Sequence, residues 1–129
     1  MTMSEQQGQV QTTVYLRPGP QGRTPVYATA GSAGCDLYAS APITLLPGET
    51  RLLPLYLVMA LEPGVEAQVR PRSGLSLNTT LRIPNAPGTI DSDYRSPMGV
   101  IVENTFNQGQ LVDRILARPE LLDEILDQC

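Results

Sequence analysis

The sequence contains no histidine, no lysine and no tryptophan. Without histidine there is no imidazole to act as a general base or as a metal ligand. Without lysine there is no Schiff-base nucleophile and no Walker-type phosphate lysine. All nine basic residues are arginines, against 13 acidic residues, and the net charge is −4. This balance predicts no nucleic-acid partner, because nucleic acids are bound by basic surfaces.

Cysteine is also scarce, with only Cys35 and Cys129 in the chain. Their separation fits neither a zinc site nor a disulfide framework, so we expect two free thiols in a reducing compartment. The first dozen residues are polar and lack the apolar stretch of a signal peptide. No segment approaches transmembrane length. We therefore expect a cytoplasmic protein with no membrane partner.

The 129 residues suffice for one domain, and 12 prolines and 11 glycines divide most of it into short apolar runs. This pattern predicts an all-β fold, a β-clip or jelly-roll-like barrel of short strands. We expect a flexible tail over residues 1–12 and a single domain over 13–129. No helical period is visible before about residue 110, and 119–127 is predicted to be a short C-terminal helix within an atypical tail, 118–129. The runs expected to form strands are 14–16, 35–39, 43–46, 51–61, 65–70 and 99–103.

Three stretches carry side chains suited to chemistry, and they span 33–39, 71–75 and 85–95. In the last, Asn85 can offer both a donor and an acceptor to a base edge. Pro87-Gly88 predicts a hairpin tip whose missing side chain lets the backbone approach a flat ligand. Asp91 can orient a water or accept its proton, and Tyr94 offers a flat face. With a guanidinium available for phosphate, these residue types indicate a nucleotide polyphosphate site.

The three stretches, in this order and spacing, resemble the first three of five motifs of the trimeric, all-β dUTP pyrophosphatases. The match runs over about 14–104, and its most specific part is 88–95. The resemblance implies a homotrimer that converts dUTP to dUMP and pyrophosphate with Mg²⁺. It also implies active sites that draw residues from more than one subunit.

The resemblance assigns a role to individual residues of this sequence. Asp91 resembles the catalytic carboxylate that activates the attacking water, and Tyr94 resembles the ring beneath the deoxyribose. Asp36 resembles the acid that holds magnesium, through water. The uracil is expected to be read by Asn85 and by the backbone that includes Gly88, Thr89 and Ile90, and the phosphates to be held by Arg72, Ser73 and Gly74.

The C-terminal part departs from the family pattern. Of the fourth motif only Asp113, Arg114 and Ile115 are in register, and the Gly-rich fifth motif, which closes over the nucleotide, has no counterpart. Three alternatives follow: an active enzyme with a differently built lid, a truncated or frame-altered product with weak activity, or a non-catalytic module that binds nucleotide or a protein partner through its tail. A dCTP deaminase shares the fold, but the intact 91–94 segment argues against it.

Overall fold

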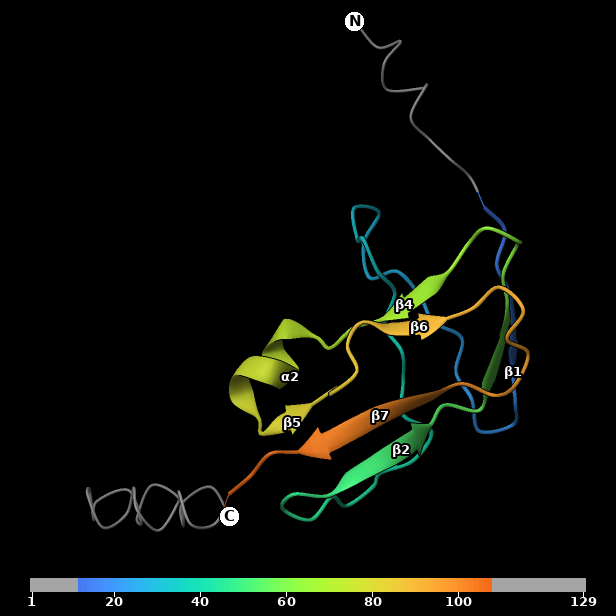
Figure 1. Ribbon diagram of the computed structural model, residues 1–129. Helices are drawn as coiled ribbons and strands as arrows, with labels where there is room; N and C mark the ends of the chain where they lie inside the picture. Colours follow the sequence, from blue (N-terminus) through green and yellow to red (C-terminus); the bar gives the residue numbers. More distant parts are fainter. Residues whose placement is uncertain (1–11, 108–129) are drawn as a thin grey trace, which may run out of the picture.

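The computed structural model describes residues 12–107 and consists mainly of short strands (Figure 1). The predictions for the tail 1–12, except for Thr12, for Asp113–Ile115 and for the helix 119–127 lie outside the described residues. No helix within residues 12–107 is long and apolar enough to cross a membrane. The elements are β1 (Tyr15–Pro18), β2 (Thr50–Pro54), β3 (Leu57–Ala60), β4 (Ala67–Val69), α2 (Ser73–Asn78), β5 (Leu81–Arg82), β6 (Gly88–Ile90) and β7 (Gly99–Asn104).

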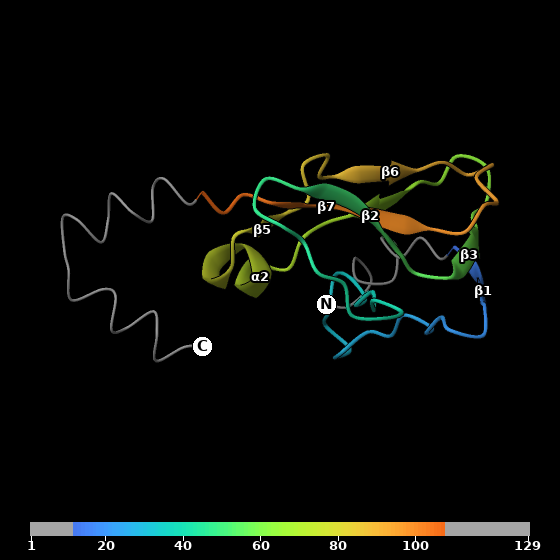
Figure 2. The same ribbon diagram turned by 90° about the horizontal axis from the view of Figure 1, so that it is seen from below.

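The strands form three small antiparallel sheets, with the orders β1-β3, β2-β7-β5 and β4-β6. The all-β prediction is therefore confirmed, although the described strands do not close into one barrel. In both ribbon views, β5 and α2 lie at one end of β7, and β1 and β3 lie at the other (Figures 1 and 2). β6 runs beside β7 and β2, which is the arrangement that creates the site.

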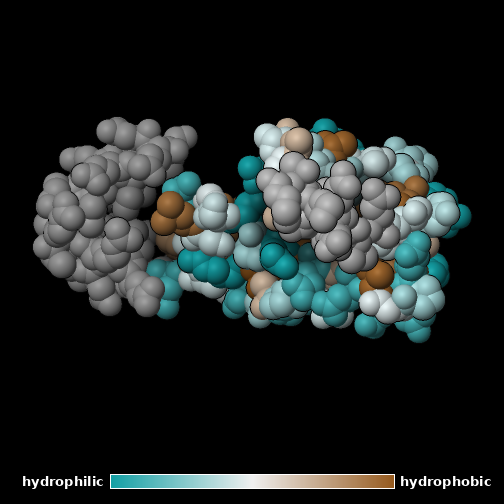
Figure 3. All heavy atoms as spheres, turned by 90° about the horizontal axis from the view of Figure 1, so that it is seen from above, coloured by the Kyte–Doolittle hydropathy of each residue, from teal (hydrophilic) through white to brown (hydrophobic). Residues whose placement is uncertain are grey.

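The core lies where the sheets meet. Its buried members alternate along β7, where Val100 and Val102 point inward and Ile101 is 37% exposed. This period of two is the pattern of a strand with one buried face. The surface seen from above is mostly hydrophilic with scattered hydrophobic patches (Figure 3). The buried cluster consists of Leu55, Leu57, Val69, Met98, Val100 and Val102.

Two residues, Leu55 and Tyr56, separate β2 from β3, and Tyr56 forms a bulge between them. Leu55 N donates to Met98 O at 3.1 Å, and Met98 N donates to Leu57 O at 2.8 Å, so both neighbours of Tyr56 face one residue. Tyr56 itself has φ 50°, a left-handed conformation that is uncommon for a bulky residue. Such a bulge bends a strand, and here it lets the run predicted at 51–61 serve two sheets.

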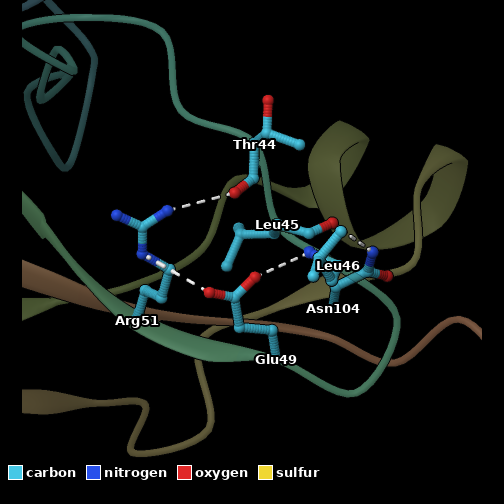
Figure 4. Close-up of polar contacts among 6 residues, drawn as sticks. All are labelled: Thr44, Leu45, Leu46, Glu49, Arg51 and Asn104. Atoms are coloured by element: carbon cyan, nitrogen blue, oxygen red, sulfur yellow. Dashed lines mark hydrogen bonds and ion pairs between the residues drawn. The ribbon is translucent and has the colours of Figure 1, made fainter.

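Two of the predicted strands do not form, and their backbone groups find other partners. In the run 35–39, the backbone forms an isolated β-bridge between Asp36 and Val26 instead of a strand. In the run 43–46, side chains replace a strand ladder (Figure 4). Asn104 Nδ2 donates to Leu45 O at 3.0 Å, Arg51 Nη1 donates to Thr44 O at 3.2 Å, and Leu46 N donates to Glu49 Oε2 at 2.8 Å. Because these groups are satisfied, the segment needs no neighbouring strand.

The expectation of no helix before about residue 110 was wrong. α2 spans six residues directly after Arg72. Six residues cover less than two helical turns, which is too short for an apolar period to appear. The helix ends at Thr79, whose backbone N and Oγ1 both donate to Leu75 O, at 3.1 and 2.6 Å.

Candidate active site

A cavity of about 220 Å³ is lined by residues of β6, β7 and β2. It brings together six of the ten residues that the sequence selected as site residues, which are Asn85, Gly88, Thr89, Ile90, Asp91 and Tyr94. Apolar side chains from β2, β4 and β7 complete its walls. The hollow thus combines polar groups along one edge with an apolar lining, as small-molecule sites usually do.

Gly88 does not sit at a hairpin tip, as the sequence had suggested. It is buried, begins β6 and is paired with Val69 of β4. A Cβ atom on Gly88 would lie 3.3 Å from Asn85 Nδ2 and 3.6 Å from Val69 Cβ. The missing side chain therefore makes room for the Asn85 amide, which is held beside the backbone of β6 at the wall of the cavity.

A tight turn follows β6 and fixes the next two candidates. Tyr94 N donates to Asp91 O at 3.1 Å, and Tyr94 Oη donates to Pro97 O at 3.1 Å. Arg95 Nη1 donates to Ser92 O at 2.6 Å, which braces the turn from outside. The phenol ring is thus tied at both ends, while 38% of Tyr94 remains exposed to a ligand.

Asp91 lies on the border between this cavity and a second, open hollow. The second hollow has a volume of about 520 Å³ and is lined by Gly64, Val65, Glu66, Asp91, Ser92 and Asp93. Within residues 12–107 the Asp91 side chain has no hydrogen-bond or ion-pair partner, and it is exposed. An exposed carboxylate at the mouth of a cavity can bind a water molecule that faces a ligand inside.

The other predicted site residues form a separate group. Arg72 Nη1 lies 3.6 Å from Asp36 Oδ2, so the structure joins the expected phosphate-binding arginine to the expected magnesium-binding acid. Ser73 and Gly74 follow at the exposed start of α2. None of these four lines either hollow in the described part of the chain. The pair is open to solvent, with 79% and 34% of the two side chains exposed, and such a pair contributes little stability.

The donor set around Asp36 is compatible with Mg²⁺ bound together with a nucleotide. Within residues 12–107 there is no group of three or more His, Cys, Asp or Glu side chains that could hold a metal ion. Mg²⁺ commonly uses one or two carboxylates and completes its shell with water and substrate phosphates. A single half-buried carboxylate beside an arginine fits that mode of binding.

Sequence reasoning missed the apolar half of the cavity. Leu52, Gly99 and Ile101 line it, although they lie far from 85–95 in the chain or outside the polar stretches. Leu52 and Ile101 are directly opposite each other in the β2–β7 ladder. Their contribution depends on strand pairing, which leaves no local signal in the sequence.

Comparison with known proteins matches most of the chain to the same family that its motifs resemble. The dUTPase family model matches residues 21–112. The deoxyuridine 5′-triphosphate nucleotidohydrolase of Anaeromyxobacter sp. (strain Fw109-5) is 45% identical over 113 residues, covering 83% of this chain and 77% of that protein. The enzyme of the same name from Bartonella bacilliformis is 49% identical over 94 residues, covering 70% of this chain and 53% of that protein.

Solved structures show the same jelly-roll-like fold. The dUTPase of Staphylococcus bacteriophage 80alpha, in a Tyr-to-Ile variant, superposes with a TM-score of 0.71 at 22% identity, covering 76% of this chain and 63% of that one. The dUTPase of phage phi11 of S. aureus, described with a structural Mg(II) ion, gives 0.69 at 25% identity, covering 73% and 61%. The chain therefore spans a little under two thirds of these phage enzymes. On the family match and the identities above, the chain belongs to the dUTPase family.

Proposed function

We propose that this protein is a dUTP diphosphatase, which hydrolyses dUTP to dUMP and pyrophosphate. The observation that carries the proposal is the cavity that gathers Asn85, β6, Asp91 and Tyr94 at one edge. The names of the relatives from Anaeromyxobacter and Bartonella support the same activity.

The polar edge of the cavity is suited to a uracil base. The Asn85 amide has one donor and one acceptor face, and the Gly88–Ile90 backbone adds further groups beside it. A base with the wrong pattern would leave such groups unpaired, and rejection of this kind can reach about 10⁴-fold. Tyr94, tied through its hydroxyl to Pro97, is placed to pack against the deoxyribose.

Asp91 is the catalytic residue of the proposal. A water molecule held by its carboxylate attacks the α-phosphorus, and the new P–O bond forms as the bond to the bridging oxygen of the leaving pyrophosphate breaks. The water's proton passes to the Asp91 carboxylate, and the products are dUMP and pyrophosphate. The position of Asp91 at the mouth of the cavity supports this role because solvent reaches it directly.

The triphosphate would be held by the second group, with Arg72 as a cationic fork and Ser73 and Gly74 at the adjoining turn. Asp36 would hold Mg²⁺ through water, and the metal would neutralise charge on the triphosphate. When nucleotide and metal arrive, the exposed Arg72–Asp36 pair can separate at small cost, because each partner gains a stronger ligand.

The separation of the two groups supports a homotrimer with shared sites. Neither Arg72 nor Asp36 lines the cavity of its own chain. We therefore infer that the phosphate-binding residues of a neighbouring copy complete the site. Several large apolar side chains are also exposed in the single chain, including Leu77 at 83%. We further infer a cytoplasmic enzyme that meets cellular dUTP, and a C-terminal segment available to a protein partner.

The activity is tested by measuring pyrophosphate release from dUTP with Mg²⁺, with dCTP, dTTP and UTP as controls. Release from dUTP alone is the expected result. Binding of dUTP without release would favour the alternative, a non-catalytic nucleotide-binding or protein-interaction module. That alternative arises because the fifth motif has no counterpart in the sequence. Equal release from dCTP and dUTP would contradict the uracil-reading role of Asn85.

A further inference from the structure

The wall of the cavity opposite β6 is apolar and comes from two other strands. Leu52 of β2 and Gly99 and Ile101 of β7 border the same hollow as Asp91 and Tyr94. Leu52 and Ile101 are cross-strand partners, and Pro54 is the partner of Gly99. These residues therefore share one face of the β2–β7 ladder, which is the face opposite the buried Val100 and Val102.

The side chain of Leu52 lies across the backbone of Gly99. A Cβ atom on Gly99 would come within 2.6 Å of Leu52 Cδ1 and 2.9 Å of its Cγ. Gly99 does not have a positive φ, so its role is to leave space rather than to adopt an unusual backbone conformation. Leu52 remains 64% exposed, which means that its branched end rests on β7 while its outer surface is free.

Tyr94 lines the same cavity as Leu52 and Gly99. Its hydroxyl donates to the carbonyl of Pro97, two residues before Gly99, and Pro97 also lines the hollow. The phenol that is placed against the sugar and the leucine seated on Gly99 thus border one region of the site. A sugar held there would have the ring and the leucine as apolar surroundings.

We propose that Leu52, seated on Gly99, is a second specificity residue, which contacts the deoxynucleoside and disfavours a ribonucleotide. This inference rests on the proposed function, because it concerns the same cavity. A 2′-hydroxyl turned toward a leucine gives up hydrogen bonds to water and gains none. The deoxyribose carries only hydrogen at that position, so it gains apolar contact instead.

The test uses calorimetric titration of two non-hydrolysable nucleotides, α,β-imido-dUTP and α,β-imido-UTP, with Mg²⁺. In Leu52→Ala, affinity for the deoxy analogue should fall about fivefold, the effect of losing a contact of one or two methylene groups. Affinity for the ribo analogue should change less than about twofold, since the lost apolar contact is offset by better solvation of the 2′-hydroxyl. The preference for deoxyribose should therefore fall by nearly the same factor as the affinity.

Gly99→Ala provides the second arm, as one half of a double-mutant cycle. Alone, the added methyl would overlap with the Leu52 side chain and force it to move. Deoxy-analogue binding should then weaken about tenfold. In the Leu52→Ala background the same change meets no leucine, and its effect should be under about twofold. Leu46→Ala is the matched control, because Leu46 is 64% exposed, as Leu52 is, and does not line the cavity.

Light scattering and thermal unfolding of each variant accompany the titrations. Unchanged deoxy preference in Leu52→Ala would overturn the inference, and so would an equal Gly99→Ala effect in both backgrounds. A change of assembly size in Leu52→Ala with equal loss for both analogues would make this face a contact between copies, which also overturns it. If the parent chain binds neither analogue, the proposed function itself fails, and that outcome is distinct from the others.

Discussion

The proposed nucleoside end and the proposed phosphate end of the site are built in different ways. The nucleoside end is formed within one chain, where β6, the turn after it and the strands β7 and β2 enclose a cavity. The phosphate end is an exposed pair, Arg72 and Asp36, beside the start of α2. A rigid pocket can select a base and a sugar by itself, whereas an exposed charge pair acts only when another surface brings the phosphates to it.

The largest effect should come from the nucleoside end, at the carboxylate. We expect Asp91→Asn to lower the rate of pyrophosphate release about a thousandfold, because the amide cannot accept a proton from water. Binding of α,β-imido-dUTP should be retained, since the size of the side chain is unchanged. Asp93→Asn is the control, as Asp93 is an exposed acid two residues away. If Asp91→Asn keeps more than a third of the parent rate, Asp91 is not the activating group.

At the phosphate end, Arg72→Ala should lower kcat/KM for dUTP by up to about a hundredfold, through the loss of charge-assisted hydrogen bonds. Binding of dUMP should change much less, because most of those contacts go to the leaving phosphates. Arg70→Ala is the matched control, since Arg70 is exposed and its described hydrogen bond goes to Gln68 Oε1 at 2.9 Å. Similar losses in both variants would point to general surface charge rather than to a phosphate ligand.

A polar network lies at the C-terminal end of β7, and its loss should affect stability before activity. Asn104 Nδ2 donates to Leu45 O, while Asn104 Oδ1 accepts from Thr80 Oγ1 at 2.8 Å and from Phe106 N at 3.0 Å. We expect Asn104→Ala to lower the free energy of unfolding by about 2 kcal/mol, as three hydrogen bonds are lost at a partly buried position.

Urea unfolding at fixed protein concentration measures this change, because oligomer stability depends on concentration. Thr44→Ala is the matched control, because the carbonyl of Thr44 accepts a hydrogen bond while its side chain has no polar partner in the described part of the chain (Figure 4). A loss in Thr44→Ala equal to that in Asn104→Ala would show that the network is not what stabilises this end of β7.

The smallest effect concerns the sugar. Tyr94→Ala should reduce the preference for dUTP over UTP about tenfold, since removing a packed ring opens space beside the ribose. The measurement is the ratio of kcat/KM values for the two nucleotides, which cancels any loss of properly folded protein. Tyr27→Ala is the comparison variant, as Tyr27 is 64% exposed and does not line the cavity. An unchanged ratio in Tyr94→Ala would remove the ring from the sugar site.

The residues predicted for the nucleoside end line one cavity, whereas those predicted for the phosphate end lie outside it. Residues 85–94 are contiguous and polar, so their cooperation could be inferred from one stretch, and the cavity lining agrees. The proximity of Asp36 and Arg72 depends on how two distant loops pack, and their ion pair could not be read from spacing. Leu52 and Gly99 were missed for a similar reason, because an apolar residue and a glycine in strands carry no chemical signal of their own.

The fold shows the same limit at smaller scale. The alternating and β-branched run 99–103 was predicted as a strand, and β7 covers it. The run 43–46 looked equally apolar, but side chains from Asn104, Arg51 and Glu49 satisfy its backbone, and no strand forms (Figure 4). α2 was missed because six residues show no helical period. Local patterns therefore predicted a strand where buried residues alternate along the sequence. They failed where contacts with distant segments determine the secondary structure.

The most direct test of the account mixes two inactive variants, Asp91→Asn and Arg72→Ala, by co-unfolding and refolding at equal amounts. If one subunit supplies the nucleoside end and its neighbour the phosphate end, mixed trimers contain some sites with both residues intact. Pyrophosphate release from dUTP should then recover to roughly a quarter of the parent rate, the share of such sites in a random cyclic assembly. Light scattering confirms that the mixture is trimeric. Release no higher than the average of the two variants alone would contradict a site shared between subunits.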